Sequence, residues 1–212
     1  MDSTIKSTVE RTRQYWYIDG FNEMLAGLVF MLLGAINFIG GLYAPSMGSA
    51  VLVGIGYPLV MLAWIFAGRV WVRSLKEKIT YPRTGYVKYI QPQRSSRVKR
   101  MVTASFVAIA VSIITMVVIR GLDPFWVVLG TGLMIAAFIG YLAVQVPLNR
   151  FFVLAIWVAA VSIASAFIPV SENLQMGFLL TGSGLGWLVS GVLTLLSYLK
   201  NTRPTEPGME EI

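Results

Sequence analysis

Long apolar stretches, each about as long as a bilayer crossing, take up most of this 212-residue chain. About 20 apolar residues are enough for a helix to span the hydrocarbon core. The stretches lack the alternation of a transmembrane β-strand, so their backbone groups must be satisfied within helices. The sequence therefore predicts an all-α fold, a polytopic membrane bundle of six transmembrane helices. The expected spans are residues 21–42, 50–71, 101–119, 125–146, 151–168 and 174–199.

Composition places the chain in the same class. Hydrophobic residues make up 56% of it and charged residues 13%, against about 25% charged residues in soluble domains. The first 20 residues are polar and the first apolar run is too long for the core of a signal peptide, so no cleaved signal is expected. We expect a cell-membrane protein built as one bundle.

The positive charges predict the orientation of this bundle. Of the 17 Lys and Arg residues, Arg120 alone falls on one side of the expected spans, and the other sixteen fall on the opposite side. Lys and Arg are enriched in cytoplasmic connections. Both termini are therefore expected in the cytoplasm.

The chain divides into three parts on this reading. Residues 1–20 form a cytoplasmic segment with interfacial aromatic side chains. Residues 21–199 form the bundle and include a basic cytoplasmic connection at 72–100. Residues 200–212 form a cytoplasmic tail that is expected to be disordered.

The connections on the other side are short and carry helix-start signals. Asp123 before Pro124 reads as an N-cap followed by proline at the first helical position, and Ser171 reads as another N-cap. None of these loops is long enough to be a substrate-capture domain.

The basic connection supplies the first set of candidate residues. Its cations could rest on anionic lipid headgroups and fix orientation, at about 1 kcal/mol each near the surface. Alternatively, its Tyr- and Arg-rich part docks a protein partner or a phosphorylated ligand. Nucleic acid is not the expected partner, because cations beside a membrane occur without it. The candidate partner or lipid contacts are Arg73, Lys76, Arg83, Tyr86 and Lys88.

The start of the first span supplies the second set. Asp19 and Glu23 are four residues apart and would share a helical face if the helix begins this early, where they could share a proton or bind a cation. The alternative is structural, because acids are favoured in a first helical turn and cations of the basic connection lie on the same side. Glu23 is the favoured functional acid, and Asn37 completes this candidate polar site.

The residue inventory limits the chemistry. The chain has no His and no Cys, so the commonest general base and the usual zinc, haem and iron–sulfur ligands are missing. We therefore expect no catalytic residues, no cofactor and no metal site. No ionisable group lies at the centre of a span, which argues against a proton-driven carrier.

Small residues four apart predict close helix packing. Gly132 and Gly140 lie on one face of the fourth span, and Gly182 and Gly186 on one face of the sixth. Such faces let helix backbones approach closely. They serve either packing within the bundle or association with a second copy or a partner subunit.

Two motifs carry a family resemblance. At Asp19–Glu23 and at Thr80–Val87 the chain resembles small prokaryotic multi-pass membrane proteins of unknown function, a likeness that implies no activity. The resemblance implies that the two motifs form one site, with Arg83 paired to Asp19 or Glu23.

These expectations favour a non-catalytic accessory or scaffold protein whose cytoplasmic face meets a partner protein or anionic lipid. A small carrier or channel for a neutral or lipid-like solute is the second hypothesis, and an intramembrane enzyme the third. The carrier predicts solvent-accessible positions around Asn37, Pro58 and Ser183, whereas the scaffold predicts a dry interior.

Overall fold

The computed structural model describes residues 17–43, 46–81, 122–146 and 148–202, and every regular element within them is helical. Five helices are long and apolar enough to cross a membrane. The second of these five helices consists of α3 followed by the shorter elements η1, α4 and η2. The elements are α2 (Phe21–Leu42), α3 (Met47–Ala63), η1 (Trp64–Gly68), α4 (Arg69–Leu75), η2 (Lys76–Thr80), α7 (Pro124–Gln145), α8 (Asn149–Ala166) and α9 (Glu172–Asn201).

Five of the six predicted spans coincide with these helices. The predicted span 21–42 matches α2 at both ends, and the last three differ from their helices by one or two residues. The helical run at the second span, Met47–Thr80, begins three residues before the predicted 50–71 and ends nine residues after it. The sixth, at 101–119, lies outside the described residues. The all-α membrane class is therefore supported, whereas the six-span count stays a prediction.

The second span continues well beyond its apolar part. Met47–Thr80 is a continuous helical run of 34 residues, about 51 Å at 1.5 Å per residue, against a hydrocarbon core of about 30 Å. Two π-helical turns, η1 and η2, interrupt its regular hydrogen bonding. This extension brings the charged residues after Gly68 level with the start of α2.

Helix starts follow the local sequence. The Asp123 carboxylate accepts a hydrogen bond from the Phe125 amide at 2.8 Å, with Pro124 at the first helical position, as predicted. Ser171 occupies the N-cap position of α9, but its side chain makes no capping hydrogen bond. A third cap, which was not predicted, is the Ser46 hydroxyl: it caps α3 by accepting from the Ser49 amide at 3.1 Å.

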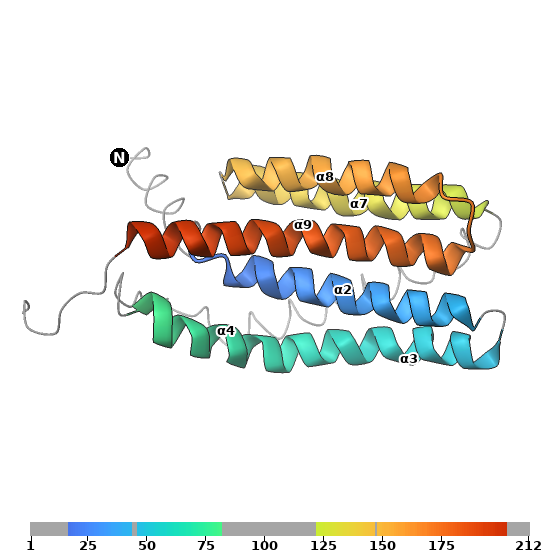
Figure 1. Ribbon diagram of the computed structural model, residues 1–212, viewed down its shortest axis with the longest axis horizontal. Helices are drawn as coiled ribbons and strands as arrows, with labels where there is room; N and C mark the ends of the chain where they lie inside the picture. Colours follow the sequence, from blue (N-terminus) through green and yellow to red (C-terminus); the bar gives the residue numbers. More distant parts are fainter. Residues whose placement is uncertain (1–16, 44–45, 82–121, 147, 203–212) are drawn as a thin grey trace, which may run out of the picture.

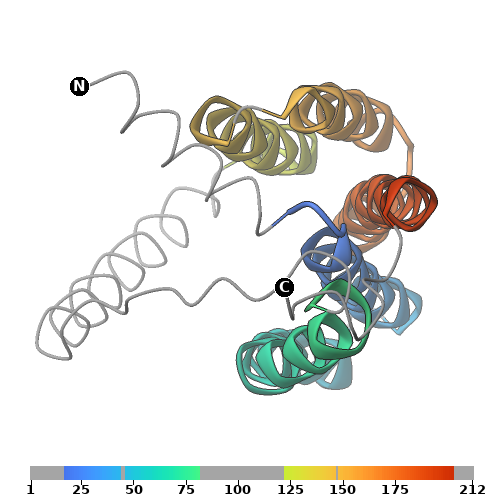
Figure 2. The same ribbon diagram turned by 90° about the vertical axis from the view of Figure 1, so that its left-hand side faces the viewer.

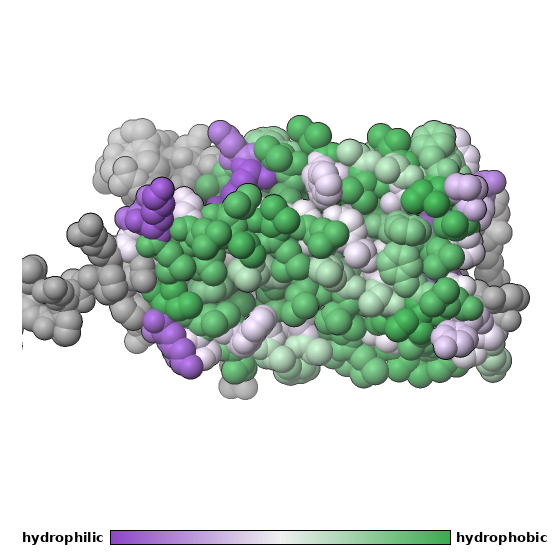
Figure 3. All heavy atoms as spheres, in the orientation of Figure 1, coloured by the Kyte–Doolittle hydropathy of each residue, from purple (hydrophilic) through white to green (hydrophobic). Residues whose placement is uncertain are grey.

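The helices run side by side along the long axis of the molecule (Figure 1). Seen end-on, they form an open arc in the order α7, α8, α9, α2, α3, and each packs on the next (Figure 2). Apolar side chains cover the visible body of the bundle, and strongly polar ones gather mainly at the end where α2 begins and α9 ends (Figure 3). We call this the charged end.

The closest packing is between α2 and α9. A Cβ atom added at Gly27 would lie 2.7 Å from the Gly184 carbonyl oxygen, and one added at Gly184 would lie 2.8 Å from the Gly27 carbonyl oxygen. Gly191 likewise packs against the Met24 backbone. Only glycine permits such backbone contact, so these residues fix the distance between the two helices.

The glycines predicted from sequence pack elsewhere, and one does not pack on the described helices. Gly132 lies against Ser162 of α8, and Gly182 lies against Val161 of the same helix. Gly186 receives the Trp157 indole, whose Nε1 donates to the Gly182 carbonyl oxygen at 2.9 Å. Among the described residues no atom lies within 4 Å of a Cβ placed on Gly140. The prediction of close packing at Gly140 is therefore not supported in this part of the chain.

Candidate functional site

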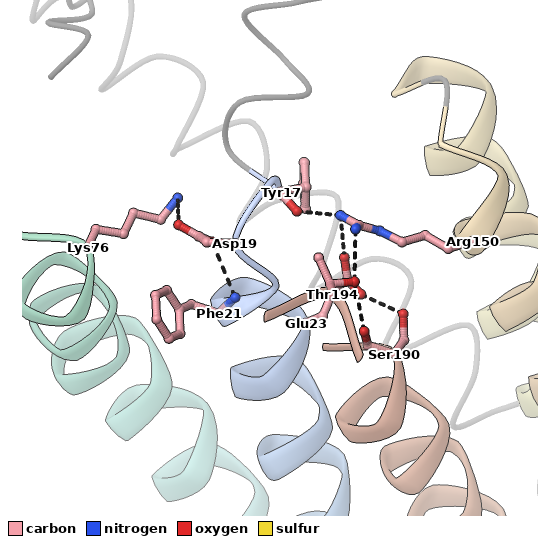
Figure 4. A network of polar contacts seen from close by, with 8 residues as sticks. All are labelled: Tyr17, Asp19, Phe21, Glu23, Lys76, Arg150, Ser190 and Thr194. Carbon is pink, nitrogen blue, oxygen red and sulfur yellow. Dashed lines mark hydrogen bonds and ion pairs between the residues drawn. The ribbon is translucent and has the colours of Figure 1, made fainter. Parts of the chain in front are cut away.

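Two buried ion pairs hold the charged end of the bundle together. They join Asp19 to Lys76 and Glu23 to Arg150, and we call these four residues the charge clasp. Figure 4 shows that the two acids, both near the start of α2, point in opposite directions toward cations from different helices.

The first pair connects the start of α2 to η2. Lys76 Nζ lies 3.1 Å from Asp19 Oδ2, and the two side chains are 4% and 0% exposed. The Thr80 hydroxyl donates to the same oxygen at 3.0 Å, while the other carboxylate oxygen accepts from the Phe21 amide at 3.3 Å. Asp19 therefore accepts from the first amide of α2 and anchors the end of the long second helix at the same time.

The second pair connects α2 to α8 and α9. Arg150 Nη2 lies 2.8 Å from Glu23 Oε1, and the Ser190 hydroxyl donates to Glu23 Oε2 at 2.6 Å. Arg150 also donates through Nη1 to the Thr194 hydroxyl at 2.9 Å and through Nη2 to the Tyr17 carbonyl oxygen. Because Nη2 is directed at that carbonyl, its contact with Glu23 is an ion pair without hydrogen-bond geometry.

The backbone explains why the two acids diverge. Gly20 adopts φ +72°, and α2 begins only at Phe21, so Asp19 lies before the helix and Glu23 within its first turn. A Cβ on Gly20 would also meet the α9 backbone at Gly191. Glycine is thus required there both for the turn and for the close approach. The expectation that Asp19 and Glu23 share one helical face is wrong for this reason.

Asn37 does not belong to the same site. It lies 14 residues after Glu23 in α2, about 21 Å away along the helix. Its amide donates to the Leu33 carbonyl oxygen at 2.8 Å and to the Tyr57 hydroxyl. The grouping of Asn37 with Asp19 and Glu23 is therefore corrected, since Asn37 instead ties α2 to α3.

The candidate contact residues of the basic connection also do not lie together in one site. Lys76 is buried against Asp19, so its prediction as a lipid or partner contact is wrong. Arg73 is exposed and pairs with Glu77 at 2.8 Å. Arg83, Tyr86 and Lys88 lie outside the described residues. The predicted pairing of Arg83 with Asp19 or Glu23 therefore stays a prediction. Among the described residues, Lys76 and Arg150 are the cations that lie beside these two acids.

The sequence predicts three of the four clasp residues as candidates, Asp19, Glu23 and Lys76, but it marks Arg150 only as one of the cations that set orientation. Thr80 opens the Thr80–Val87 motif, but the sequence assigns it no contact of its own. Ser190 and Thr194 lie four apart on α9, a spacing that presents both hydroxyls on one face. A lone arginine next to an apolar run is the signal that could have found the pair, because such a cation either reaches the interface or pairs with an acid inside the bundle.

The site is a low-dielectric environment in which each acid lies against a cation, while Glu23 Oε1 and Arg150 Nε have no hydrogen-bond partner. Removing an ion from water costs several kcal/mol, and a buried pair recovers this only with good geometry and further hydrogen bonds. Thr80, Ser190 and Thr194 supply those bonds. Burial, and secondarily the charge of Glu23, raises the pKa of Tyr17 at the edge of the site above its usual value, so its phenol stays protonated.

The arrangement offers no evident place for a metal. Within the described ranges no three Asp or Glu side chains come together. The two acids of the clasp are directed apart, and a cation already lies against each.

A second feature is a groove of about 720 Å³ on the concave side of the arc. Side chains of α2, the α3–η1 junction, α7 and α9 line it, and nearly all of them are apolar. We call it the concave groove. Its lining includes Tyr17, Asn22, Ala26, Met61, Trp64, Phe138 and Trp187.

Comparisons with known proteins give no family for this chain: no family model matches it, and neither a curated protein nor a solved structure does.

Proposed function

We propose that this chain is a non-catalytic integral membrane protein, an accessory or scaffold whose charged end meets a partner protein or anionic lipid. In this proposal it has six spans, and its charged end, with both termini, faces the cytoplasm. The distribution of Lys and Arg supports that orientation.

The charge clasp carries the proposal. A transporter or enzyme would present its strongest polar groups to a substrate, whereas Asp19 and Glu23 are buried and each lies against a cation of another helix. The clasp thereby sets the relative positions of α2, η2, α8 and α9 at the end that would meet a partner. This is what a fixed docking platform needs.

The interior supports the same reading. Asn37 and Ser183, two of the positions where a carrier would need solvent access, are buried, and Asn37 is hydrogen-bonded to Tyr57. Pro58, the third, is exposed on the outside of α3. A dry interior was the expectation for a scaffold.

The test is extraction of the full chain from native membranes in a mild detergent, followed by mass spectrometry of co-purifying proteins. The variant Arg73→Gln/Lys78→Gln removes two exposed cations from the charged end. The matched control Leu122→Glu/Val170→Glu lowers the formal net charge of +7 equally, to +5, at the opposite end. We expect a stoichiometric partner to be lost from the first variant and kept by the control.

The scaffold proposal fails if no stoichiometric protein is recovered, or if both variants keep it equally. A second copy of this chain as the stoichiometric species would make the protein a homodimer, and the same pair of variants would show whether the charged end forms the contact.

The second candidate function is a small carrier or channel for a neutral or lipid-like solute. The concave groove favours it, because a mainly apolar cavity of this size is typical of small-molecule sites. Reconstituted vesicles that accelerate flip or passage of such a solute would place this function first.

A further inference from the structure

The two edges of the arc are joined by a part of the chain that connects opposite ends of the bundle. The long second helix ends at the charged end, where the Thr80 hydroxyl donates to Asp19 Oδ2 at 3.0 Å. Helix α7 begins at the opposite end, where the ring of Phe125 packs against that of Phe167, just beyond the last turn of α8. Residues 82–121, which lie outside the described ranges, run between these two points.

The directions of the flanking helices require one more crossing. The run Met47–Thr80 and α7 both start at the opposite end and finish at the charged end, so the chain has to return between them. Residues 101–119 contain no Asp, Glu, Lys or Arg. As a helix they would be about 28 Å long, close to the hydrocarbon thickness of about 30 Å. This argument for a sixth span does not depend on hydropathy alone.

The start of α7 limits where this stretch ends. Four residues, 120–123, separate it from Pro124. Connections this short join helices that are antiparallel neighbours. On one side α7 already packs against α8. Another side of α7 faces the concave groove, where Ile135, Phe138 and Leu142 form one wall.

The concave groove offers a neighbouring helix contacts on several sides at once. Its volume is about 720 Å³, and α2, α9 and the α3–η1 junction line it together with α7. Helices α3 and α7 lie at the two edges of the arc (Figure 2). Trp64 and Phe138, which line the groove from these two edges, are 43% and 61% exposed. Helix association in a membrane depends on van der Waals packing, so a groove with walls from several helices favours an apolar helix as its occupant.

The stretch has a face that suits these large side chains. Small residues recur along it every three or four positions and would share one side of a helix. Such a side lets neighbouring side chains and backbones approach closely, and it keeps hydroxyl groups away from lipid. The residues are Ala104, Ala108, Ser112 and Thr115.

We propose that residues 101–119 form a sixth helix that occupies the concave groove, antiparallel to α3 and α7, with its small-residue face toward the groove. The occupant is a segment of this chain, tied to α7 by a short connection, rather than a lipid or a second copy. The groove is then part of the protein core, and a carrier would need its solute pathway elsewhere. This placement rests on the six spans of the proposed function and not on its partner.

Disulfide cross-linking of the full chain in its native membrane tests the placement. The chain has no Cys, so each engineered pair is the only one present. Ile135 lies 11 residues after Pro124, and Ala108 lies 11 residues before residue 119, so an antiparallel helix puts the two at about the same depth. We expect Ala108→Cys/Ile135→Cys to form a disulfide within one chain on oxidation.

Two matched pairs control for the face of each helix. Ala110→Cys is the same exchange on the opposite side of the proposed helix and should not link to Ile135→Cys. Met134→Cys is next to Ile135 in α7 but is 67% exposed, and it should not link to Ala108→Cys. A disulfide to Met134→Cys in place of Ile135→Cys would put the stretch on the outer face of α7 and overturn the proposal.

The α3 edge of the groove is tested separately. Met61→Cys is combined in turn with a cysteine at each position of 101–119, and at least one position of the small-residue face should form an intrachain disulfide. Links to Ile135→Cys without any link to Met61→Cys would leave the groove itself unfilled. That result, links formed only between two copies, or no links at all would each overturn the proposal.

A stability measurement covers the case in which cysteine pairs disturb the fold. Ala108→Phe would force a ring between the proposed helix and the groove, and such overpacking is destabilising. We expect it to lower the denaturant midpoint of unfolding in mixed micelles. Ala110→Phe adds the same ring on the opposite side and should leave the midpoint unchanged. Equal midpoints for the two variants contradict the proposal.

Failure of this inference is distinguishable from failure of the proposed function. Labelling of Arg120→Cys by a membrane-impermeant thiol reagent from the outer side, without disulfides to Ile135→Cys or Met61→Cys, would keep six spans and reject the groove placement alone. Labelling from the cytoplasmic side would reject both the six spans and the placement. The scaffold role is tested independently, by the partner that Arg73→Gln/Lys78→Gln is expected to lose.

Discussion

The two neighbours of α2 are held in different ways. On the α9 side, glycines bring the backbones into direct contact at Gly27 and Gly184, and the Glu23 pair locks the charged end. On the α3 side, the long helix is held by side chains, with Asn37 and Tyr57 in the middle and Asp19 and Lys76 at the end. In the most apolar 18-residue stretch of this helix 0% of the residues are buried, against 33% in that of α2.

The two sides of α2 therefore have different roles in the bundle. The α2–α9 pair, with α8 behind it, is a rigid core, because glycine contacts cannot slide or widen without loss of packing. On the other side, α3 is joined to α2 at separate points. The concave groove lies next to these two helices and is also lined by α7 and α9. We therefore expect stability to depend on the α9 side, and the packing proposed for residues 101–119 to depend on the α3 and α7 side.

The largest effect is expected from breaking the clasp on the α9 side. Arg150→Met leaves the fully buried Glu23 carboxylate without its cation, and removing one member of a buried pair costs about 3 kcal/mol or more. The free energy of unfolding in mixed micelles measures this. The double variant Glu23→Gln/Arg150→Met leaves no buried charge and should recover most of the loss.

The matched control is the exposed pair. Arg73 and Glu77 have side chains that are 77% and 50% exposed, so Arg73→Met should change stability by about 0–0.5 kcal/mol. Equal losses for Arg150→Met and Arg73→Met would mean that burial of the clasp contributes nothing, which contradicts the division proposed above.

The next effect is expected at the glycine contact. In Gly27→Ala the new methyl group would lie 2.7 Å from the Gly184 carbonyl oxygen, a backbone atom that cannot turn away. Overpacking of this kind costs about 1–3 kcal/mol. The control Gly130→Ala adds the same methyl group where no described atom lies within 4 Å. A glycine pair that tolerates alanine as well as Gly130 does would show that α2 and α9 are not held at a fixed distance.

A smaller effect is expected on the α3 side. Tyr57→Phe removes one hydrogen bond between helices, and Asn37 keeps its bond to the Leu33 carbonyl oxygen. Interhelical hydrogen bonds in membranes contribute about 0.6 kcal/mol on average. The same unfolding measurement should give a loss well below that of Gly27→Ala, and a larger loss would make the α3 side part of the rigid core.

Span positions were predictable from sequence because hydrocarbon sets one physical requirement, length in apolar residues. The limits of α2 were predicted at both ends, and the Asp123 cap was predicted because its chemistry is local.

The site was predicted only in part, because it depends on which helices are neighbours. Asp19 and Glu23 were found as acids near a helix start, but Arg150 is far from them in sequence. Gly27 and Gly184, which bring the backbones of α2 and α9 into contact, were missed because the four-residue spacing of Gly182 and Gly186 marks a different face of α9. Residue spacing shows that one face of a helix carries small side chains, and only the fold shows which helix packs against that face.

The smallest effect is expected from Tyr17, and only in alkali. Its pKa is raised by burial and by Glu23, so the unfolded chain ionises this phenol first as the pH rises past about 10. The stability that Tyr17 contributes is therefore fully present below pH 10 and is lost as the pH rises toward its folded pKa. Tyr17→Phe removes this titration, so its unfolding free energy should fall less steeply than that of the native chain above pH 10, while the two run parallel at neutral pH. Parallel curves throughout would mean that the phenol is as accessible in the folded chain as in the unfolded one, and that the polar end of the concave groove is open to water.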